Sequence, residues 1–219
     1  MNLLIIGAPG AGKGTMSSRL VANYNLVHIS TGDILRQAIA DQTPVGKLAA
    51  TFMDKGQLVP DEVIHDIIVE RLKKDDIKRG FLFDGYPRTL AQAIDFSKIL
   101  DELNMKIDAV LNLQIDDEII IKRITGRRIC KTCGSIFNIY YATPKVEGVC
   151  DKCGEPLQTR KDDNLESLQI RLQEFHNNTQ PVIDYYTKDN LVKNIVADQN
   201  AEDEFADIQK VLEGLKWFR

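Results

Sequence analysis

The sequence predicts an α/β protein in which helices flank a parallel sheet of five strands, with two segments inserted into this core. Three observations carry the prediction. Short apolar runs alternate with helical patterns along the chain, which is typical of parallel sheets. A glycine-rich turn joins the first apolar run to the first helix. Residues 126–163 interrupt the alternation with turn-rich sequence and hold all four cysteines.

Apolar runs bounded by turn residues predict the strands, at 2–6, 27–29, 81–83, 109–115 and 191–196. Capping residues and apolar spacing predict the helices. We expect one helix to begin near Lys13, another to follow Ser30 and run to about Ala40, and others over 45–54, 61–73, 89–103 and 202–216. A further helix begins at the acidic run 116–118, and a long one begins near Asn164 with a kink or break at Pro181.

The composition of the 219 residues excludes several classes of protein. Hydrophobic residues make up 43% and charged residues 27%, so the chain can bury a sizeable core. A net charge of −4 gives no global attraction for a polynucleotide or an anionic membrane. The apolar run from Leu3 to Ile6 is far too short to span a membrane and lacks the basic lead of a signal peptide. We therefore expect neither a nucleic acid nor a membrane as partner, and a cytoplasmic location.

The segment from Gly7 to Thr15 has the form and context of a phosphate-binding loop, since it follows a strand and opens a helix. Its glycines let backbone N–H groups turn toward phosphate oxygens, and the helix N-terminus adds positive potential. Lys13 can reach the β- and γ-phosphates of a nucleotide. Strict Walker A spelling places Ser or Thr directly after the lysine, whereas here Gly14 stands between Lys13 and Thr15.

Binding of polyphosphates and phosphoryl transfer depend on positioning and on fixed positive charge. The sequence supplies seven candidate cations, which the family resemblance described below selects from the other basic residues: Lys13, Arg36, Arg88, Arg123, Arg127, Arg160 and Arg171. Asp84 ends the apolar run 81–83 and could hold Mg²⁺ through water molecules. Gln92 offers a donor and an acceptor side by side, which suits adenine. We expect structural or surface roles for His28, His65 and His176.

The four cysteines are spaced as two pairs, Cys130 with Cys133 and Cys150 with Cys153. Two CxxC turns separated by sixteen residues fall within the range of four-cysteine zinc sites. A closed shell of four thiolates leaves no position for water, so such a metal is structural. Iron fits the same sulfurs, and disulfides or free thiols are the alternatives without metal.

These motifs resemble those of adenylate kinases, in the same order and over nearly the whole chain. The likeness rests on Gly7 to Thr15, on Ser30 to Asp33 with Arg36, and on Asp84 to Thr89 with Gln92. It continues through Ile124 to Arg128 and Arg160 to Asp163. The insertion with cysteines resembles the long, zinc-binding form found mainly in Gram-positive bacteria. The resemblance implies a P-loop nucleoside monophosphate kinase fold. Its core would comprise 1–29, 60–125 and 164–219, with a mobile AMP-binding segment at 30–59 and a mobile zinc-binding lid at 126–163.

The resemblance also implies roles for individual residues. The catalytic set would be Lys13, Asp84, Arg88, Arg127, Arg160 and Arg171. ATP would contact Gly10, Ala11, Gly12, Lys13, Gly14, Thr15, Arg123, Arg127, Ile136, Phe137 and Gln199. AMP would contact Thr31, Arg36, Gln57, Leu58, Val59, Gly85, Tyr86, Pro87, Arg88, Gln92, Arg160 and Arg171. The metal ligands would be Cys130, Cys133, Cys150 and Cys153. The chain departs from common family residues at Met16, Gln57 and Gln199.

The implied activity is the reversible, Mg²⁺-dependent conversion of ATP and AMP to two ADP by a monomer that also holds structural Zn²⁺. A kinase for UMP, CMP or GMP is a close alternative, which Gln92 and the cysteine-bearing lid disfavour. A nucleic-acid-binding module with 126–163 as a zinc ribbon is disfavoured by the acidic balance. A regulatory GTPase is disfavoured because no Asn-Lys-x-Asp motif follows the later strands.

Overall fold

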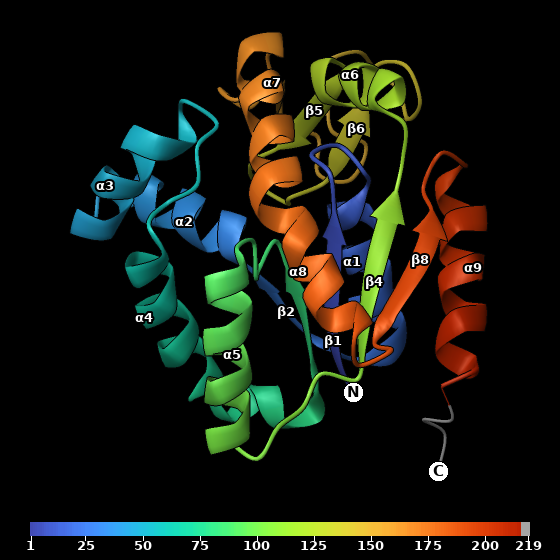
Figure 1. Ribbon diagram of the computed structural model, residues 1–219. Coiled ribbons are helices and arrows are strands. Elements are labelled where there is room, and N and C mark those ends of the chain that lie inside the picture. The colour runs from blue at the N-terminus through green and yellow to red at the C-terminus, as the bar shows by residue number, and fades with distance from the viewer. Residues whose placement is uncertain (216–219) are drawn as a thin grey trace.

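The computed structural model describes residues 1–215, and its centre is a parallel sheet of five strands in the order β2-β3-β1-β4-β8 (Figure 1). All four strand pairs are parallel. The strands are β1 (Asn2–Gly7), β2 (Val27–Ser30), β3 (Phe81–Asp84), β4 (Ala109–Gln114) and β8 (Val192–Val196). The predicted five-stranded parallel sheet flanked by helices is confirmed, and each strand differs from its predicted range by one residue at one end.

The helices follow the predicted order, with caps where the sequence indicated them. The oxygen of Ser30 accepts a hydrogen bond from the backbone of Asp33, and that of Thr89 from Gln92. The helices are α1 (Lys13–Tyr24), α2 (Thr31–Ala40), α3 (Pro44–Met53), α4 (Asp61–Leu72), α5 (Leu90–Glu102), α6 (Asp117–Thr125), α7 (Leu165–Glu174), α8 (Gln180–Thr187) and α9 (Ala201–Glu213). A 3₁₀ turn at Asp75–Arg79 was not predicted. The closing helix ends at Glu213 instead of 216, which lies outside the described residues.

The predicted break near Pro181 is a π-helical turn, Phe175–Thr179, which separates α7 from α8. Pro181 is the second residue of α8. Proline has no N–H to donate to the carbonyl of residue 177, so regular α-helical bonding cannot continue through this point. The interruption therefore lies on the N-terminal side of the proline, as the missing donor requires.

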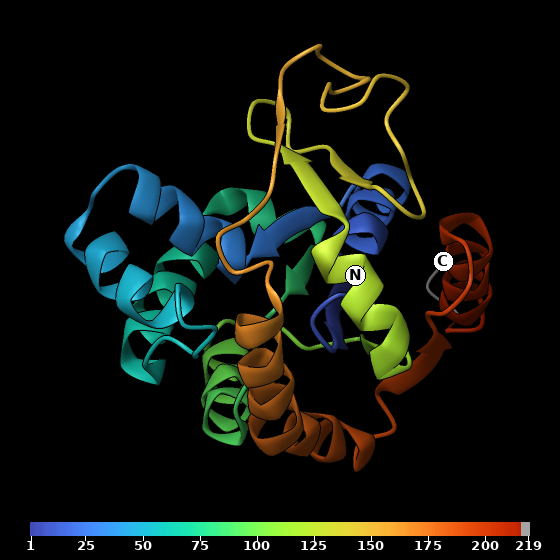
Figure 2. The same ribbon diagram turned by 90° about the horizontal axis from the view of Figure 1, so that it is seen from above.

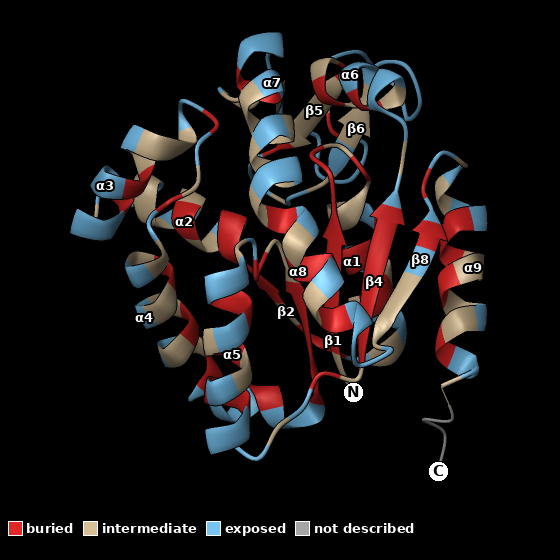
Figure 3. Cartoon of the chain, in the orientation of Figure 1, coloured by how far each residue is buried: buried red, intermediate tan, exposed pale blue. Residues whose placement is uncertain are grey.

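The sheet divides the interior into two apolar cores because successive side chains of a strand point to opposite faces. Leu3 and Ile5 of β1 belong to the core that α1 and α9 cover, whereas Leu4 and Ile6 belong to the core under α4, α5 and α8. Figure 3 shows the buried strands between the partly exposed helices. Burial on both faces explains why these strands read as continuous apolar runs in the sequence.

The carboxyl ends of the parallel strands lie along one edge of the sheet, the upper edge in Figure 1. Ser30 pairs in register with Asp84, and Ile5 pairs with Asp84 from the other side. The turns that follow β1, β2 and β3 therefore converge at this edge. In open α/β sheets, ligands bind outside the carboxyl ends of the strands.

Residues 126–163 contain a second, antiparallel sheet in the order β6-β5-β7. Its strands are β5 (Arg127–Cys130), β6 (Ile136–Asn138) and β7 (Leu157–Gln158). They were not predicted, because strands of two to four residues are too short to show a period. Figure 2 shows this segment projecting from the main body, with α2 and α3 at another side. Within residues 1–215, none of the helices has the length and apolar character that crossing a bilayer requires.

Close packing of α3 on α2 yields the first testable prediction. A Cβ atom built on Gly46 would lie 2.0 Å from the backbone oxygen of Ala38, which cannot move aside as a side chain can. Gly46→Ala should lower the free energy of unfolding by about 1–3 kcal/mol. Gly214→Ala is the matched control, because Gly214 has a helical φ of −63° and its nearest neighbour would lie 3.4 Å away. Equal stability of the two variants in urea denaturation would contradict the packing argument.

Candidate functional site

A cavity of about 970 Å³ opens at the carboxyl edge of the parallel sheet. Its walls come from the loop at 7–15, the ends of β2 and β3, the segment 127–142 and helix α7. A second cavity of about 80 Å³ adjoins it and shares Arg36, Arg88 and Arg171 with it. The larger cavity is at the upper end of the volumes of small-molecule sites, roughly 300–1,000 Å³. The site therefore has two unequal compartments, which meet at a group of arginines.

The loop between β1 and α1 is built to receive an anion. Gly12 has a left-handed φ of 95° and directly precedes α1, so the helix N-terminus opens toward the larger cavity. The Lys13 ammonium donates hydrogen bonds to the carbonyl oxygens of Gly7 and Ala8, at 2.7 and 3.0 Å. Burial lowers the pKa of Lys13 to about 7, and neighbouring arginines act in the same direction, while Asp84 opposes them. An anion placed beside Lys13 would restore its positive charge.

All seven cations predicted from the sequence line the larger cavity. Burial of the guanidinium group, helped by repulsion from Arg171, lowers the pKa of Arg88 to about 10, although part of the side chain is exposed to the cavity. Burial likewise lowers the pKa of Arg160 to about 10, and within residues 1–215 the Nε atom of Arg160 has no hydrogen-bond partner. These guanidinium groups repel one another and are poorly solvated, so the group is suited to a ligand with several negative charges.

Ion pairs hold three of the arginines in place. Arg127 pairs with Asp163 through both oxygens of that carboxylate. Arg171 donates to Asp162 at 2.9 Å. Arg36 pairs with Asp33 within α2. Asp162 and Asp163 are the last residues of the turn-rich segment, so these ion pairs attach the end of that segment to two arginines of the cavity.

The two cavities sort the predicted contact residues. The larger is lined by Gly10, Gly12, Lys13, Gly14, Thr15, Arg123, Arg127, Ile136, Phe137, Gln199, Pro87 and Arg160. The smaller is lined by Thr31, Arg36, Gln57, Leu58, Val59, Gly85, Tyr86, Arg88, Gln92 and Arg171. Ala11 is buried beneath the loop and lines neither cavity. All predicted ATP contacts except Ala11 line the larger cavity, and all predicted AMP contacts except Pro87 and Arg160 line the smaller one. Six of the AMP contacts line both cavities: Arg36, Leu58, Gly85, Tyr86, Arg88 and Arg171.

Gln92 lies at the wall of the smaller cavity and is tightly held by its neighbours. Its amide oxygen accepts a hydrogen bond from the backbone of Arg88 at 2.7 Å, and its amide nitrogen donates to Asp61 at 2.6 Å. Thr89 donates to the other oxygen of Asp61 at 2.9 Å. One N–H and one lone pair of the amide remain for a ligand. Asp61 thus sets which end of the amide is the donor.

Asp84 stands at the end of β3 beside two polar side chains. The Ser17 hydroxyl donates to it at 3.4 Å, and Nε2 of His28 lies 3.7 Å from the same oxygen. We expected only a structural or surface role for His28, but it lines the larger cavity. A carboxylate facing a cavity that suits a polyphosphate fits Mg²⁺ held through water molecules.

Glu204 is a cavity residue that the sequence reasoning missed. It is buried on α9 and lines the larger cavity near Gly12. One signal was available in the sequence: Glu204 interrupts the apolar face that Ala201, Ile208 and Leu212 form at helical spacing.

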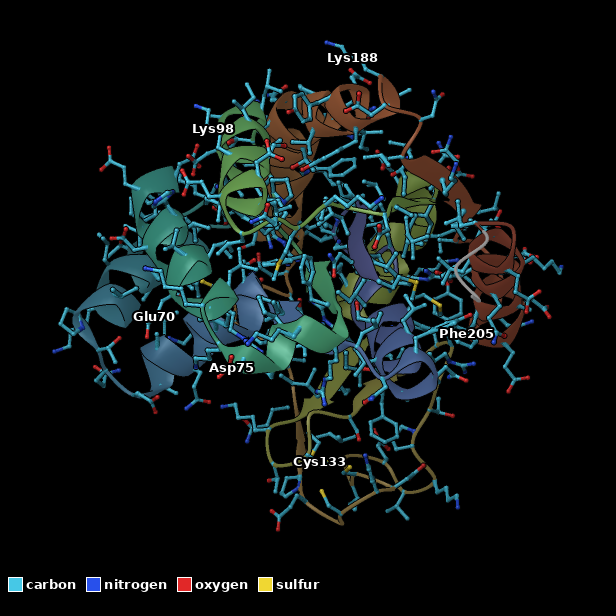
Figure 4. The ribbon with its side chains drawn as sticks, turned by 90° about the horizontal axis from the view of Figure 1, so that it is seen from below. Glu70, Asp75, Lys98, Cys133, Lys188 and Phe205 are labelled. Atoms are coloured by element: carbon cyan, nitrogen blue, oxygen red, sulfur yellow. The ribbon has the colours of Figure 1, made fainter. Side chains whose placement is uncertain are left out.

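The four cysteines form the cluster that their spacing predicted. Their sulfur atoms all lie within 4.8 Å of one another. The shortest separations, 3.4 Å from Cys130 to Cys153 and 3.5 Å from Cys133 to Cys150, join the two pairs. Zinc at 2.3 Å from four sulfurs in a tetrahedron would space them about 3.8 Å apart, so the cluster is compatible with structural zinc. Figure 4 shows Cys133 in the projecting segment, away from the main body.

The two CxxC turns have the same backbone hydrogen bonds. The N–H of Gly134 donates to the carbonyl of Cys130 at 2.9 Å, and that of Gly154 donates to Cys150 at 2.8 Å. Both glycines have left-handed φ values, 72° and 76°. Such turns point two sulfurs in one direction, and together they present four to one metal ion.

Comparisons with known proteins agree on one family. The sequence profile of the family described as "Adenylate kinase" matches residues 5–191. An adenylate kinase of Bacillus subtilis is 46% identical over 216 residues, which are 99% of this chain and 100% of that protein. One of Thermoanaerobacter sp. (strain X514) is 48% identical over 212 residues, 97% of this chain and 98% of that protein. One of Caldicellulosiruptor bescii is 50% identical over 210 residues, 96% of each.

The cysteine cluster leads to a prediction about stability. Elemental analysis should find one Zn²⁺ per chain, and Cys130→Ser should lose the metal and lower the melting temperature. The reason is that metal bound only to the folded state stabilises it, and this segment has little apolar core of its own. Thr132→Ser, an exposed change within the same turn, is the control. Loss of less than half of the metal, or an unchanged melting temperature, would contradict the structural role.

Proposed function

This chain belongs to the adenylate kinase family and transfers a phosphoryl group reversibly from ATP to AMP, and we propose that the seven cations predicted from the sequence, which all line the larger cavity, align the two nucleotides. The reaction gives two ADP, depends on Mg²⁺ and maintains adenine nucleotide balance. One observation carries the assignment of roles: two compartments of unequal size meet at Arg36, Arg88 and Arg171. The larger compartment takes ATP against the loop 7–15, and the smaller takes the AMP base beside Gln92.

The loop and the arginines supply positioning and charge stabilisation. Lys13 leaves the carbonyls of Gly7 and Ala8 and donates to the phosphates of ATP. Arg88 and Arg36 hold the AMP phosphate, while Arg123 and Arg127 face ATP. Arg160, with its free Nε atom, and Arg171 approach the group being transferred. Because the transition state spreads negative charge over the moving phosphoryl oxygens, donors fixed beforehand around that point lower the barrier.

Asp84 is the residue that would hold Mg²⁺ through water molecules. When bound, Mg²⁺ would neutralise part of the negative charge of the ATP phosphates. The Ser17 hydroxyl donates a hydrogen bond to the Asp84 carboxylate, and the His28 ring lies near the same oxygen. Cys130, Cys133, Cys150 and Cys153 would hold the structural Zn²⁺, which takes no part in the transfer.

Two segments would close over the nucleotides and exclude water, namely the AMP-binding segment at 30–59 and the lid at 126–163. The core would be 1–29, 60–125 and 164–219. Lys161 of the lid lies 3.7 Å from Asp54 of the AMP-binding segment, so the two segments already approach each other. Closure protects the phosphoryl group from hydrolysis, and a zinc site makes the lid move as a rigid unit.

We assign the activity to a monomer in the cytoplasm that acts on free nucleotides and has neither a nucleic acid nor a membrane as partner. The seven cations assigned to the nucleotides all come from a single chain, so the proposed site does not need a second copy. The net charge of −4 opposes binding to anionic surfaces.

Replacing Lys13 tests the role of the loop. Lys13→Met should reduce kcat for ADP formation from ATP and AMP roughly 100-fold or more, because a preorganised charge at the phosphates is lost. Lys98→Met is the control, since Lys98 lies on the outer surface of α5 (Figure 4). The same coupled assay with UMP, CMP and GMP in place of AMP should give much lower rates. Unchanged turnover in Lys13→Met would refute its role, and faster turnover with UMP would refute the acceptor.

Replacing Gln92 tests recognition of the acceptor base. Gln92→Ala should raise KM for AMP by the equivalent of about 1–3 kcal/mol and leave KM for ATP nearly unchanged, because of the two nucleotides only AMP would contact this side chain. Gln37→Ala, at an exposed glutamine of α2, should change neither constant. Equal increases in both KM values for Gln92→Ala would mean that the residue is structural.

A further inference from the structure

Glu204 is an acid in a place where the fold offers it little compensation. It lies on the face of α9 that packs on the sheet and α1, and it is only 2% exposed. Its neighbour Phe205 lies between α9 and α1 (Figure 4). The Oε1 atom of Glu204 has no hydrogen-bond partner, and among residues 1–215 no ion pair within 4.0 Å includes this carboxylate. An ionised carboxylate that is buried without partners destabilises the folded state, so we expect either a ligand or a proton to compensate for its charge.

The carboxylate faces the larger cavity beside the phosphate-binding loop. A Cβ atom built on Gly12 would lie 3.5 Å from Oε1 of Glu204, 3.7 Å from its Oε2 and 3.5 Å from Nη1 of Arg123. The loop, the carboxylate and the guanidinium therefore meet around one point. Arg123 reaches this point from the last turn of α6 and donates weakly to the carbonyl of Gln199, at 3.4 Å.

The charged groups facing Glu204 come from three elements. Arg123 of α6 and Arg19 of α1 are the cations, and Asp198, in the turn before α9, is the anion. Arg19 is also held over the ring of Phe205, with its guanidinium 5.8 Å from the ring centroid. Burial outweighs the two arginines and raises the pKa of Glu204 to about 7. The carboxyl group thus changes charge near neutral pH.

We propose that Glu204 is a positioning residue on the ATP side of the site, which acts through Arg123 and takes up a proton from solvent when ATP binds. This inference rests on the proposed function, in which ATP occupies the larger cavity between the loop 7–15 and Arg123. While Glu204 is ionised, it attracts Arg123 and places a negative charge beside the nucleotide. Protonated Glu204 no longer attracts Arg123, which can then bind the nucleotide. The neutral carboxyl group also no longer repels the nucleotide.

Bound ATP would favour protonation of Glu204 in two ways, which act in the same direction. A bound polyanion favours the neutral carboxyl directly, and it also draws away the Arg123 charge that stabilised the carboxylate. By linkage, protonation of Glu204 favours ATP to the same extent. ATP should therefore bind more tightly as the pH falls through 7, and Glu204→Gln should bind ATP at pH 8 as tightly as at pH 6, apart from changes common to both proteins.

The test measures KM for ATP and for AMP at pH 6 and pH 8 in the wild-type enzyme and Glu204→Gln. Glu202→Gln is the matched control, because it removes the same charge from an exposed position of α9. The wild type and Glu202→Gln should lose roughly fivefold more ATP affinity between pH 6 and pH 8 than Glu204→Gln does, with no such difference for AMP. Titration of Lys13 and of ATP itself is common to all three proteins and cancels in the comparison.

Parallel pH profiles of wild type and Glu204→Gln would overturn the proposal, and so would an equal effect on AMP. Glu204→Leu, which suits the apolar face of α9, should behave like Glu204→Gln and serves if the amide does not fold. The melting temperature of each variant, measured at both pH values, checks folding. Absence of ADP formation by the wild type would instead refute the proposed function, and the inference with it.

Discussion

Repulsion among the cations of the nucleotide site is the constraint on which the rest of this structure depends. Burial is the largest cause that lowers the pKa values of Arg88, Arg160 and Arg171, and neighbouring guanidinium groups lower them further. Burial and the nearby arginines lower the pKa of Lys13 in the same way. Charges of one sign in a poorly solvated cavity destabilise a folded chain unless the rest of the fold holds them. The carboxylates of Asp162 and Asp163 compensate only part of this charge.

The parallel sheet is what makes this arrangement possible. An apolar core covers each face of the sheet. Parallel pairing brings the ends of β1, β2 and β3 to one edge, where the loop 7–15, Ser30 and Asp84 meet. The remaining arginines come from distant parts of the chain, α7 and the segment 126–163 among them. The parallel sheet thus carries a group of cations at its carboxyl edge that suits the binding of polyanions. In the proposed mechanism, attraction to the bound nucleotides would close the segments 30–59 and 126–163 over this edge.

Local patterns in the sequence predicted much of this, and long-range packing accounts for what they missed. The loop around Lys13, the strands and the cysteine pairs are defined by neighbouring residues, so their sequence signals are strong. The partner of Gln92 is Asp61, thirty-one residues away, and nothing local connects them. His28 reaches Asp84 only because β2 and β3 pair in register. Glu204 has a local signal, an acid within an apolar face, but its neighbours Gly12 and Arg123 are apparent only in the fold.

The melting temperature of the nucleotide-free protein in rising concentrations of inorganic tripolyphosphate tests the central claim most directly. Tripolyphosphate carries the charge of a nucleotide but no base or ribose, so it reports on the cation group alone. The account predicts a melting temperature that rises with the logarithm of tripolyphosphate concentration, by an amount that shrinks as salt is added. A melting temperature that tripolyphosphate leaves unchanged at low salt would contradict the claim that uncompensated positive charge dominates this site.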